Sequence, residues 1–231
     1  MGQKLEVAAQ VKQILSKSPL SELPSPVIDR LLVEAQRIDV PRNTALYNTE
    51  GNPRCALILS GLIRLFMASP DGRQVTVRYA RSAELIGLAE IISGPSPVSA
   101  QVLTDAKLLL LDGNSLAHLG QTEPRAGWIF AGEITLRLYD TLQALAANTF
   151  GTLRQRIARH LLDLAASSSR TTQLVATINQ QELADAVGSV RPVVARILRD
   201  LRAEGLIETT RDGIALLDAE ALVAETWAKS V

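Results

Sequence analysis

The spacing of apolar residues changes twice along the chain and divides it into three parts. Up to about Arg37, apolar residues recur at helical spacing, and prolines interrupt the helices. From Val40 to Leu111 the apolar runs are short, and glycines and prolines separate them. After Pro124 the helical spacing returns. The pattern predicts a β-rich part between two helical parts.

The β-rich part has the pattern of a small antiparallel roll. Runs 55–59, 62–67 and 75–79 are apolar or alternate between apolar and polar residues, as strands do. Asp71-Gly72 separates two of these runs, and this dipeptide is a strong signal for a tight hairpin turn. Short strands with regular turn spacing are typical of a β-sandwich or β-roll.

The helical stretch after Pro124 continues to about Asn148 and predicts contact between two helices. Apolar and small residues recur in it every seven positions, as in a two-stranded coiled coil. A single amphipathic helix packed on its own β-rich domain would give a similar pattern, so both arrangements remain open. The positions expected at the dimer seam are Trp128, Ala131, Thr135, Leu138, Leu142 and Leu145.

The most informative pattern lies near the C-terminus and predicts two helices joined by a tight turn. Asn179 and Glu182 have the spacing of a capping box, in which each side chain accepts a hydrogen bond from a backbone N–H at the helix start. Gly188 then ends the helix, because glycine readily adopts the positive φ that a sharp turn needs. The second helix has one apolar face, and the arginines on the opposite face are Arg191, Arg196, Arg199 and Arg202.

An arginine-rich helix face is suited to DNA. A guanidinium can donate two hydrogen bonds to guanine in the major groove and also neutralises phosphate. A solvated surface helix can carry the same residues, but the capped helix and glycine turn before it favour a helix-turn-helix. Residues 206–217 then predict two short strands around Arg211-Asp-Gly213. The C-terminal part therefore has the pattern of a winged helix that binds double-stranded DNA.

At these residues the sequence resembles a family of bacterial regulators, the CRP/FNR family, typified by the cAMP receptor protein and the fumarate–nitrate regulator. The similarity covers nearly the whole chain and is strongest from Leu153 to Ile207. Val190-Arg-Pro-Val-Val-Ala-Arg196 is similar to the recognition signature Ser-Arg-Glu-x-Val-x-Arg of that family. Val190 replaces the capping serine, a role that we expect Ser189 to take. Pro192 replaces the acidic residue that helps to read base edges in the family.

The resemblance implies an α+β protein with three parts. Residues 1–123 would form leading helices and an N-terminal antiparallel β-roll, a jelly roll of the cyclic-nucleotide-binding type, that acts as the sensor. Residues 124–149 would form a long dimerisation helix and hinge, and residues 150–231 a winged helix-turn-helix DNA-binding domain. It also implies a homodimer that binds a near-palindromic site, contacts RNA polymerase and is not an enzyme.

The expected DNA contacts lie on and around the arginine-rich helix. Arg191, Val193 and Arg196 are expected to read bases, with Val193 against a thymine methyl group or the sugar edge. Pro192 cannot accept a hydrogen bond from cytosine, so the half-site should differ from the usual family sequence at that position. The candidates for phosphate contacts are Asn179, Gln181, Ser189 and Arg199.

The effector pocket that the resemblance implies lacks two groups that bind cAMP in the family. Leu88 stands in place of the glutamate that binds the ribose, and Val98 in place of the arginine that binds the cyclic phosphate, whereas Ser99 matches. Because a buried phosphate without a paired cation is unfavourable, we expect an unidentified small-molecule effector other than cAMP, or none. A cyclic-nucleotide response remains the alternative, since arginines elsewhere can supply the charge: Arg73, Arg78 and Arg81.

Composition restricts the other possibilities. The chain has 24 basic and 24 acidic residues, so attraction to DNA has to come from a local arrangement. The single cysteine, Cys55, excludes an intrachain four-cysteine iron–sulfur cluster and leaves a redox response as a further alternative. Neither His118 nor His160 has a pattern that singles it out as a haem ligand. No histidine precedes residue 118, which argues against a cupin-like metalloenzyme, and the sequence predicts no metal and no cofactor.

Membrane and secretion signals are missing from the sequence. No apolar run approaches the roughly 20 residues of a membrane span. The first residues, Met-Gly-Gln-Lys-Leu-Glu, lack the apolar core of a secretion signal. We therefore expect a cytoplasmic protein without membrane contact.

Overall fold

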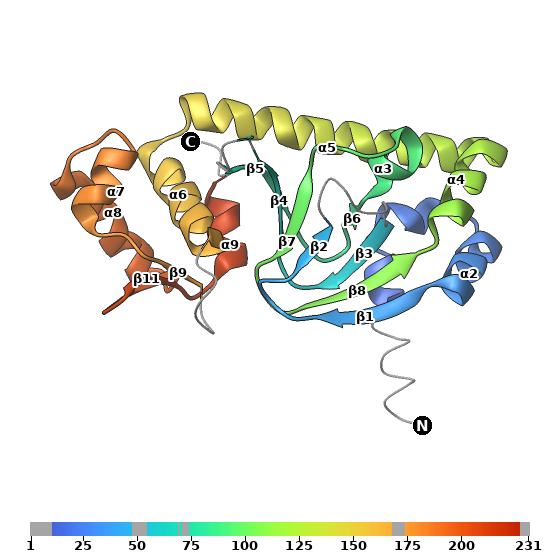
Figure 1. Ribbon diagram of the computed structural model, residues 1–231, viewed down its shortest axis with the longest axis horizontal. Coiled ribbons are helices and arrows are strands. Elements are labelled where there is room, and N and C mark those ends of the chain that lie inside the picture. The colour runs from blue at the N-terminus through green and yellow to red at the C-terminus, as the bar shows by residue number, and fades with distance from the viewer. Residues whose placement is uncertain (1–10, 48–54, 69, 71–73, 168–173, 227–231) are drawn as a thin grey trace, which may run out of the picture. The chain divides into compact units, whose positions relative to one another are not determined.

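Antiparallel sheets form the framework of the N-terminal unit, as the sequence pattern predicted (Figure 1). The computed structural model describes residues 11–47, 55–68, 70, 74–167 and 174–226. One sheet has the order β1-β8-β3-β6, with strands Gln36–Val40, Ala106–Leu111, Cys55–Ser60 and Leu85–Ile86. The other has the order β2-β7-β4-β5, with strands Ala45–Tyr47, Ser99–Val102, Ile63–Ala68 and Gln74–Ala80. We refer to the two sheets together as the β-roll.

The first sheet has a separate apolar core on each of its faces. In β3, Ala56 and Ile58 pack in a cluster with residues of the second sheet such as Ile63. Cys55, Leu57 and Leu59, which point the other way, pack in a cluster with residues from helices. A strand buried on both faces has an almost continuous apolar run, and this is why 55–59 shows little alternation.

Helices cover the second of these clusters. Residues 11–15 are helical, and the 3₁₀-helix η1 spans Pro19–Glu22. Prolines occupy the first turns of η1 and of α2, where a backbone N–H has no helical acceptor in any case. The predicted hairpin turn at Asp71-Gly72 lies outside the described residues, but β4 and β5 on either side of it are paired antiparallel. The helices of this unit are α2 (Ser25–Glu34), α3 (Leu88–Ser93), α4 (Gly113–Thr122) and the first part of α5 (Pro124–Phe150).

The boundary between the two compact units of the chain lies within α5. The units are Met1–Asp140 and Thr141–Val231, and two residues separate the end of α5 from the start of α6 (Leu153–Ser167). The sequence instead predicted boundaries after residues 123 and 149, with the helix as a separate segment between the two domains. In the described residues, no helix is both long and apolar enough to cross a membrane.

The C-terminal unit consists of helices around a small sheet. Its strands have the order β10-β11-β9, and β10 and β11 form the predicted hairpin with Arg211 and Asp212 in the turn. A side chain at Gly213, where φ is +141°, would collide with the carbonyl oxygen of Ala176 in β9. Glycine therefore allows the hairpin to approach β9 closely. The elements after α6 are β9 (Val175–Ala176), α7 (Gln180–Ala186), α8 (Arg191–Ala203), β10 (Ile207–Thr210), β11 (Gly213–Leu216) and α9 (Ala219–Glu225).

Candidate nucleic-acid interface

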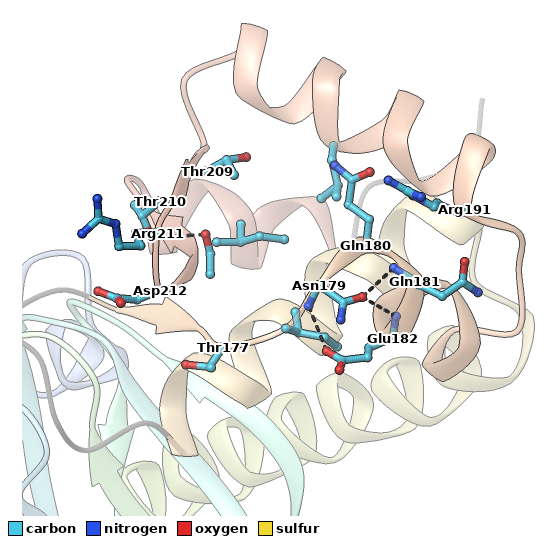
Figure 2. A pocket seen from close by; sticks show the side chains of 14 residues that line it. Thr177, Asn179, Gln180, Gln181, Glu182, Arg191, Thr209, Thr210, Arg211 and Asp212 are labelled. Atoms are coloured by element: carbon cyan, nitrogen blue, oxygen red, sulfur yellow. Dashed lines mark hydrogen bonds between the residues drawn. The ribbon is translucent and has the colours of Figure 1, made fainter.

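The start of α7 has the predicted capping box (Figure 2). The Asn179 Oδ1 atom accepts hydrogen bonds from the backbone N–H groups of Gln181 and Glu182, both at 2.9 Å. The Glu182 carboxylate accepts from the backbone N–H of Asn179 at 3.0 Å. These bonds satisfy N–H groups that lack acceptors at a helix start, and so fix where α7 begins.

A sharp turn leads from α7 into α8. Gly188 has φ of +64°, as its place in the sequence predicted, and the backbone N–H of Ser189 donates to the carbonyl of Ala184 at 2.8 Å. The residues of α8 that are buried are Val194, Leu198 and Leu201, which confirms the apolar face.

The expectation that Ser189 caps α8 is wrong. The N-cap residue is Val190, which is extended with φ of −111° and has no side-chain acceptor. Ser189 lies one residue too early, because the turn at Gly188 uses its backbone. Pro192 lies in the first helical turn, as predicted, and contributes no N–H there. One fewer donor therefore needs an acceptor at a helix start that lacks a side-chain cap.

Three arginines of α8 have no acceptor among the residues that the structure describes. Arg191, Arg196 and Arg199 are exposed, and none makes an ion pair or a side-chain hydrogen bond in the part of the chain that the structure describes. The fourth, Arg202, donates from Nη1 to the Thr209 hydroxyl at 2.6 Å and so joins α8 to β10. The face of α8 thus presents positive charge that no acidic group in the described part of the chain pairs with.

Arg154, on another helix, forms an ion pair with Glu204, the acidic residue just after α8. Arg154 of α6 is 2.5 Å from Glu204, just after α8, and 2.6 Å from Glu225 of α9. The hydrogen bond to Glu225 raises the pKa of Arg154, with a further contribution from Glu204, against the opposing effect of burial. Because Glu204 is paired with Arg154, it is not available to the arginines of α8.

A groove of about 620 Å³ lies between the start of α7, the start of α8 and the hairpin of β10 and β11, which we call the wing (Figure 2). Asn179, Gln181 and Arg191 line it, so the structure brings these three predicted contact residues together. Arg196 and Arg199 lie further along α8 and are not among its lining residues. The sequence pattern predicted the wing but no contact residues on it. The groove adds five lining residues: Thr177, Gln180, Thr209, Thr210 and Arg211.

The predicted effector residues lie in apolar surroundings. Leu88 begins α3 and is 4% exposed in the cluster beneath the helices. Val98 packs against the cluster between the two sheets, and Ser99 is the first residue of β7 and half-buried. Of the arginines considered as substitutes, Arg78 is buried and bonded to Glu84, Arg81 is half-buried, and Arg73 lies outside the described residues.

Cys55 has the opposite of the properties that a thiol sensor needs. It is fully buried in β3, and burial raises the pKa of the Cys55 thiol from 9.0 to about 12, with smaller contributions from the charges of Glu90 and Glu133. Oxidation and disulfide exchange require an accessible thiolate. The structure therefore argues against redox sensing at this residue.

We expect Cys55 to resist alkylation in the folded protein. A shift of the pKa from 9.0 to about 12 lowers the thiolate population about a thousandfold at neutral pH, and burial slows the reaction further. Mass spectrometry after iodoacetamide treatment should detect labelling only when guanidinium unfolds the chain. A native labelling rate within tenfold of the unfolded rate would show that the thiol is accessible after all.

One face of α5 packs on the β-roll and another is exposed. Ala126, Ile129 and Phe130 are buried in the cluster beneath the helices. The opposite face is apolar, and Trp128 on it is 82% exposed. Several large apolar side chains exposed on one helix are typical of a protein interface. The predicted seam residues are all exposed: Trp128, Ala131, Thr135, Leu138, Leu142 and Leu145.

Comparison with known proteins agrees with both units. Residues 37–123 match the cyclic nucleotide-binding domain and residues 155–225 match the Crp-like helix-turn-helix domain. The transcriptional regulator LdrP of Thermus thermophilus is 34% identical over 71% of this chain and 83% of its own length. A CRP-like cAMP-activated global transcriptional regulator of Mycobacterium tuberculosis is 26% identical over 91% of this chain and 97% of its own.

Solved structures show the same fold. A transcriptional regulator from Eubacterium rectale, assigned to the Crp/Fnr family, superposes with a TM-score of 0.60 and 20% identity over 90% of this chain and 97% of its own. The two matched domains, the relatives and the arrangement of α7, α8 and the wing agree with one another. The chain belongs to the CRP/FNR family, and it is a DNA-binding transcription regulator rather than an enzyme.

Proposed function

We propose that the protein is a homodimer that reads a near-palindromic DNA site through α8, under the control of a signal other than cAMP. The observation that carries the proposal is the set of exposed guanidinium groups at Arg191, Arg196 and Arg199, none of which is paired within the described residues. Exposed arginines on the open face of a helix-turn-helix match the acceptors of guanine and of phosphate. A dimer with two-fold symmetry would present two copies of α8 one DNA turn apart, about 34 Å.

The proposed contacts divide into base reading and positioning. Arg191, Val193 and Arg196 would read base edges, because they lie in the first two turns of α8. The residues proposed to hold the phosphate backbone are Asn179, Gln181, Ser189 and Arg199, together with Thr209 and Arg211 of the wing. Pro192 would leave one base pair without the acceptor that family members provide.

The proposed dimer forms along the exposed face of α5. Leu138, Leu142 and Leu145 would pack against their counterparts in a second copy, while the opposite face stays on the β-roll. We further propose contact with RNA polymerase and action in the cytoplasm. The proposal requires no metal or cofactor.

The proposed signal differs from cAMP because of the apolar residues at the implied effector site. Leu88 and Val98 provide neither a ribose acceptor nor a cation. A cyclic-nucleotide response is the second candidate, since the Mycobacterium tuberculosis relative is described as cAMP-activated. Isothermal titration with cAMP distinguishes the two candidates, and we expect no measurable heat of binding.

Selection of bound duplexes from a random DNA library tests the main proposal. The purified full-length protein, without added ligand, is expected to enrich a two-fold symmetric motif. Binding that is insensitive to sequence and lost at moderate salt would mean that the free protein is not in a specific DNA-binding state. Lack of binding at low salt would contradict the proposed role of the α8 arginines.

A further inference from the structure

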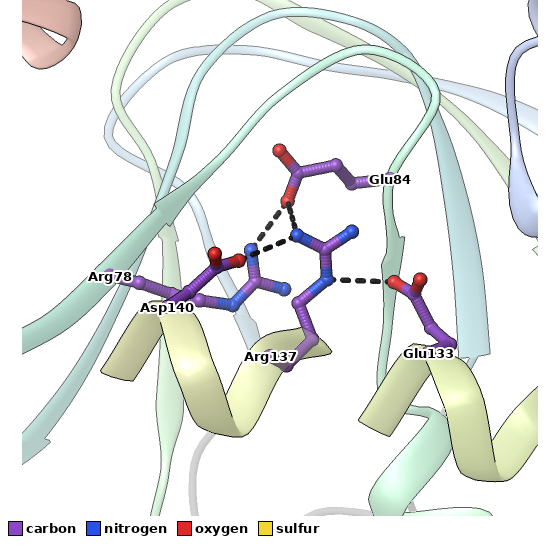
Figure 3. Close-up of polar contacts among 5 residues, drawn as sticks. All are labelled: Arg78, Glu84, Glu133, Arg137 and Asp140. Atoms are coloured by element: carbon purple, nitrogen blue, oxygen red, sulfur yellow. Dashed lines mark hydrogen bonds and ion pairs between the residues drawn. The ribbon is translucent and has the colours of Figure 1, made fainter. Parts of the chain in front are cut away.

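Charged side chains join the β-roll to α5 within the N-terminal unit (Figure 3). The Oε2 atom of Glu84 lies 2.5 Å from Nη1 of Arg78 in β5 and 3.3 Å from Nη1 of Arg137 in α5. Arg137 also donates from Nε to Glu133 at 2.7 Å and from Nη1 to Asp140 at 2.8 Å, both on its own helix. The Glu84 carboxylate therefore connects an arginine of the sheet with an arginine of the helix.

The register of the sheet places Arg78 on the inner face of the β-roll. Arg78 pairs with Leu65 of β4, and Leu65 pairs on its other side with Ala100 of β7. Paired residues of neighbouring strands share a face, and Leu65 and Ala100 belong to the cluster between the sheets. The Arg78 side chain is 6% exposed. A guanidinium that is buried this far needs a paired anion, because its desolvation is otherwise uncompensated.

The backbone holds Glu84 where it can provide that anion. The N–H of Glu84 donates to the carbonyl of Arg81, and its own carbonyl accepts from Ile58 of β3 at 3.0 Å. Ala83, which precedes it, has φ of +71°, a conformation that residues other than glycine adopt rarely. Ala83 donates to the carbonyl of Ile58 at 2.9 Å, so both residues are fixed to a central strand. The side chain of Glu84 thus leaves from a rigid turn.

The carboxylates of the cluster are sufficient to balance the charge of its arginines. Two guanidinium groups face three carboxylates, those of Glu84, Glu133 and Asp140. Burial would lower the pKa of Arg137, but the bond to Glu133 and the charge of Glu84 outweigh it and raise that pKa, so the guanidinium stays charged. A phosphate or carboxylate that approached these arginines from solution would have to displace Glu84.

We propose that Glu84 is a built-in anionic ligand, whose carboxylate occupies an anion site formed by Arg78 and Arg137 and fixes α5 to the β-roll without an external anion. The site takes a small carboxylate or another small anion once the Glu84 side chain is removed. Since α5 carries the exposed leucines, the same contact sets the position of the proposed dimer helix on the β-roll. This last step rests on the proposed function, whereas the anion site itself does not.

Chemical rescue of Glu84→Ala tests the anion site. The substitution removes a CH₂–COO⁻ group, which acetate matches in size and charge. We expect the Tm of the full-length variant to fall by roughly 5–15 °C, because both arginines lose their shared partner. Acetate at neutral pH and constant ionic strength should raise this Tm by several degrees. Neutral acetamide, which has nearly the same shape, should not.

Three controls make the result specific to this site. The wild type should show no acetate effect, because Glu84 fills the site. Asp39→Ala removes a carboxylate that is paired with Arg37 at 3.9 Å but is exposed, and should show neither the loss nor the rescue. Glu84→Gln keeps the volume of the side chain, so acetate should not rescue it. Equal rescue of Glu84→Ala by acetate and acetamide, or an unchanged Tm in both Glu84 variants, would overturn the proposal.

DNA affinity provides a separate readout of the link to α5. Glu84→Ala should bind the selected DNA site about tenfold more weakly than the wild type, and acetate should restore the affinity of the variant. Rescue of Tm with unchanged DNA affinity would overturn the link to α5 and leave the anion site. If the wild type itself does not bind specific DNA, the proposed function fails, while the Tm experiment still decides on the anion site.

Discussion

Replacing Arg196 with alanine is expected to lower the affinity for the selected DNA site by roughly 1–3 kcal/mol for each half-site and to relax the preference at one base pair. Arg196 is exposed on α8 and has no acceptor in the described part of the chain. Its removal therefore breaks no contact that the fold needs. The loss should be confined to sequences with the preferred base at that position, as titration of matched and mismatched duplexes by fluorescence anisotropy will show.

Arg199→Ala is the matched control for this prediction. Arg199 lies on the same helix and likewise has no partner among the described residues, but we assign it to phosphate. Its loss should weaken binding to all duplexes by a similar factor and reduce the slope of log K against log salt by about one unit. If Arg196→Ala behaves in the same way, Arg196 holds phosphate and does not read a base.

Replacing Leu138 with glutamate is expected to convert the protein to a monomer at micromolar concentration. In the proposed dimer, two copies of Leu138 pack against each other, so the change removes two buried leucines and places two like charges side by side. The dissociation constant of the dimer should rise by about a hundredfold or more. Sedimentation velocity over a range of concentrations measures this directly. Binding to a full palindrome should fall to the level of a single half-site.

Leu136→Glu distinguishes the seam from the rest of the helix surface. Leu136 is 56% exposed, close to the 54% of Leu138, but it falls outside the seven-residue repeat. It should leave the dimer intact. If both variants remain dimeric, or if the wild type is itself a monomer, the dimer interface does not lie along this face of α5.

Local patterns in the sequence were sufficient to predict the helix-turn-helix and most of the strands. The capping box at Asn179, the turn at Gly188 and the hairpin before Gly213 each depend on residues that are near one another in the chain. Such features can be read from a few adjacent residues. The strands β1, β2, β6 and β9 were not predicted, and the two-residue strand β9 shows why: it exists only through its pairing with β11.

The charge pairings could not be predicted for the same reason. Arg154 pairs with Glu204 across 50 residues, and Arg137 reaches Glu84 from another element. Neither pair could be inferred from the residues around it in the sequence. In contrast, the error at Ser189 is local: its backbone N–H is part of the turn at Gly188, and the N-cap of α8 is the next residue, Val190.

The pairing of Glu204 with Arg154 also bears on how the protein finds its sites in a genome. A bacterial chromosome offers millions of random sequences that compete for any protein with a broad basic surface. This chain has no net charge, and three exposed guanidinium groups of α8 have no acceptor among the described residues. Its residence on random DNA should therefore be brief, and a larger share of the molecules stays available for rare matching sites. Selectivity of this kind comes from weak binding to random DNA rather than from especially strong binding to the matching site.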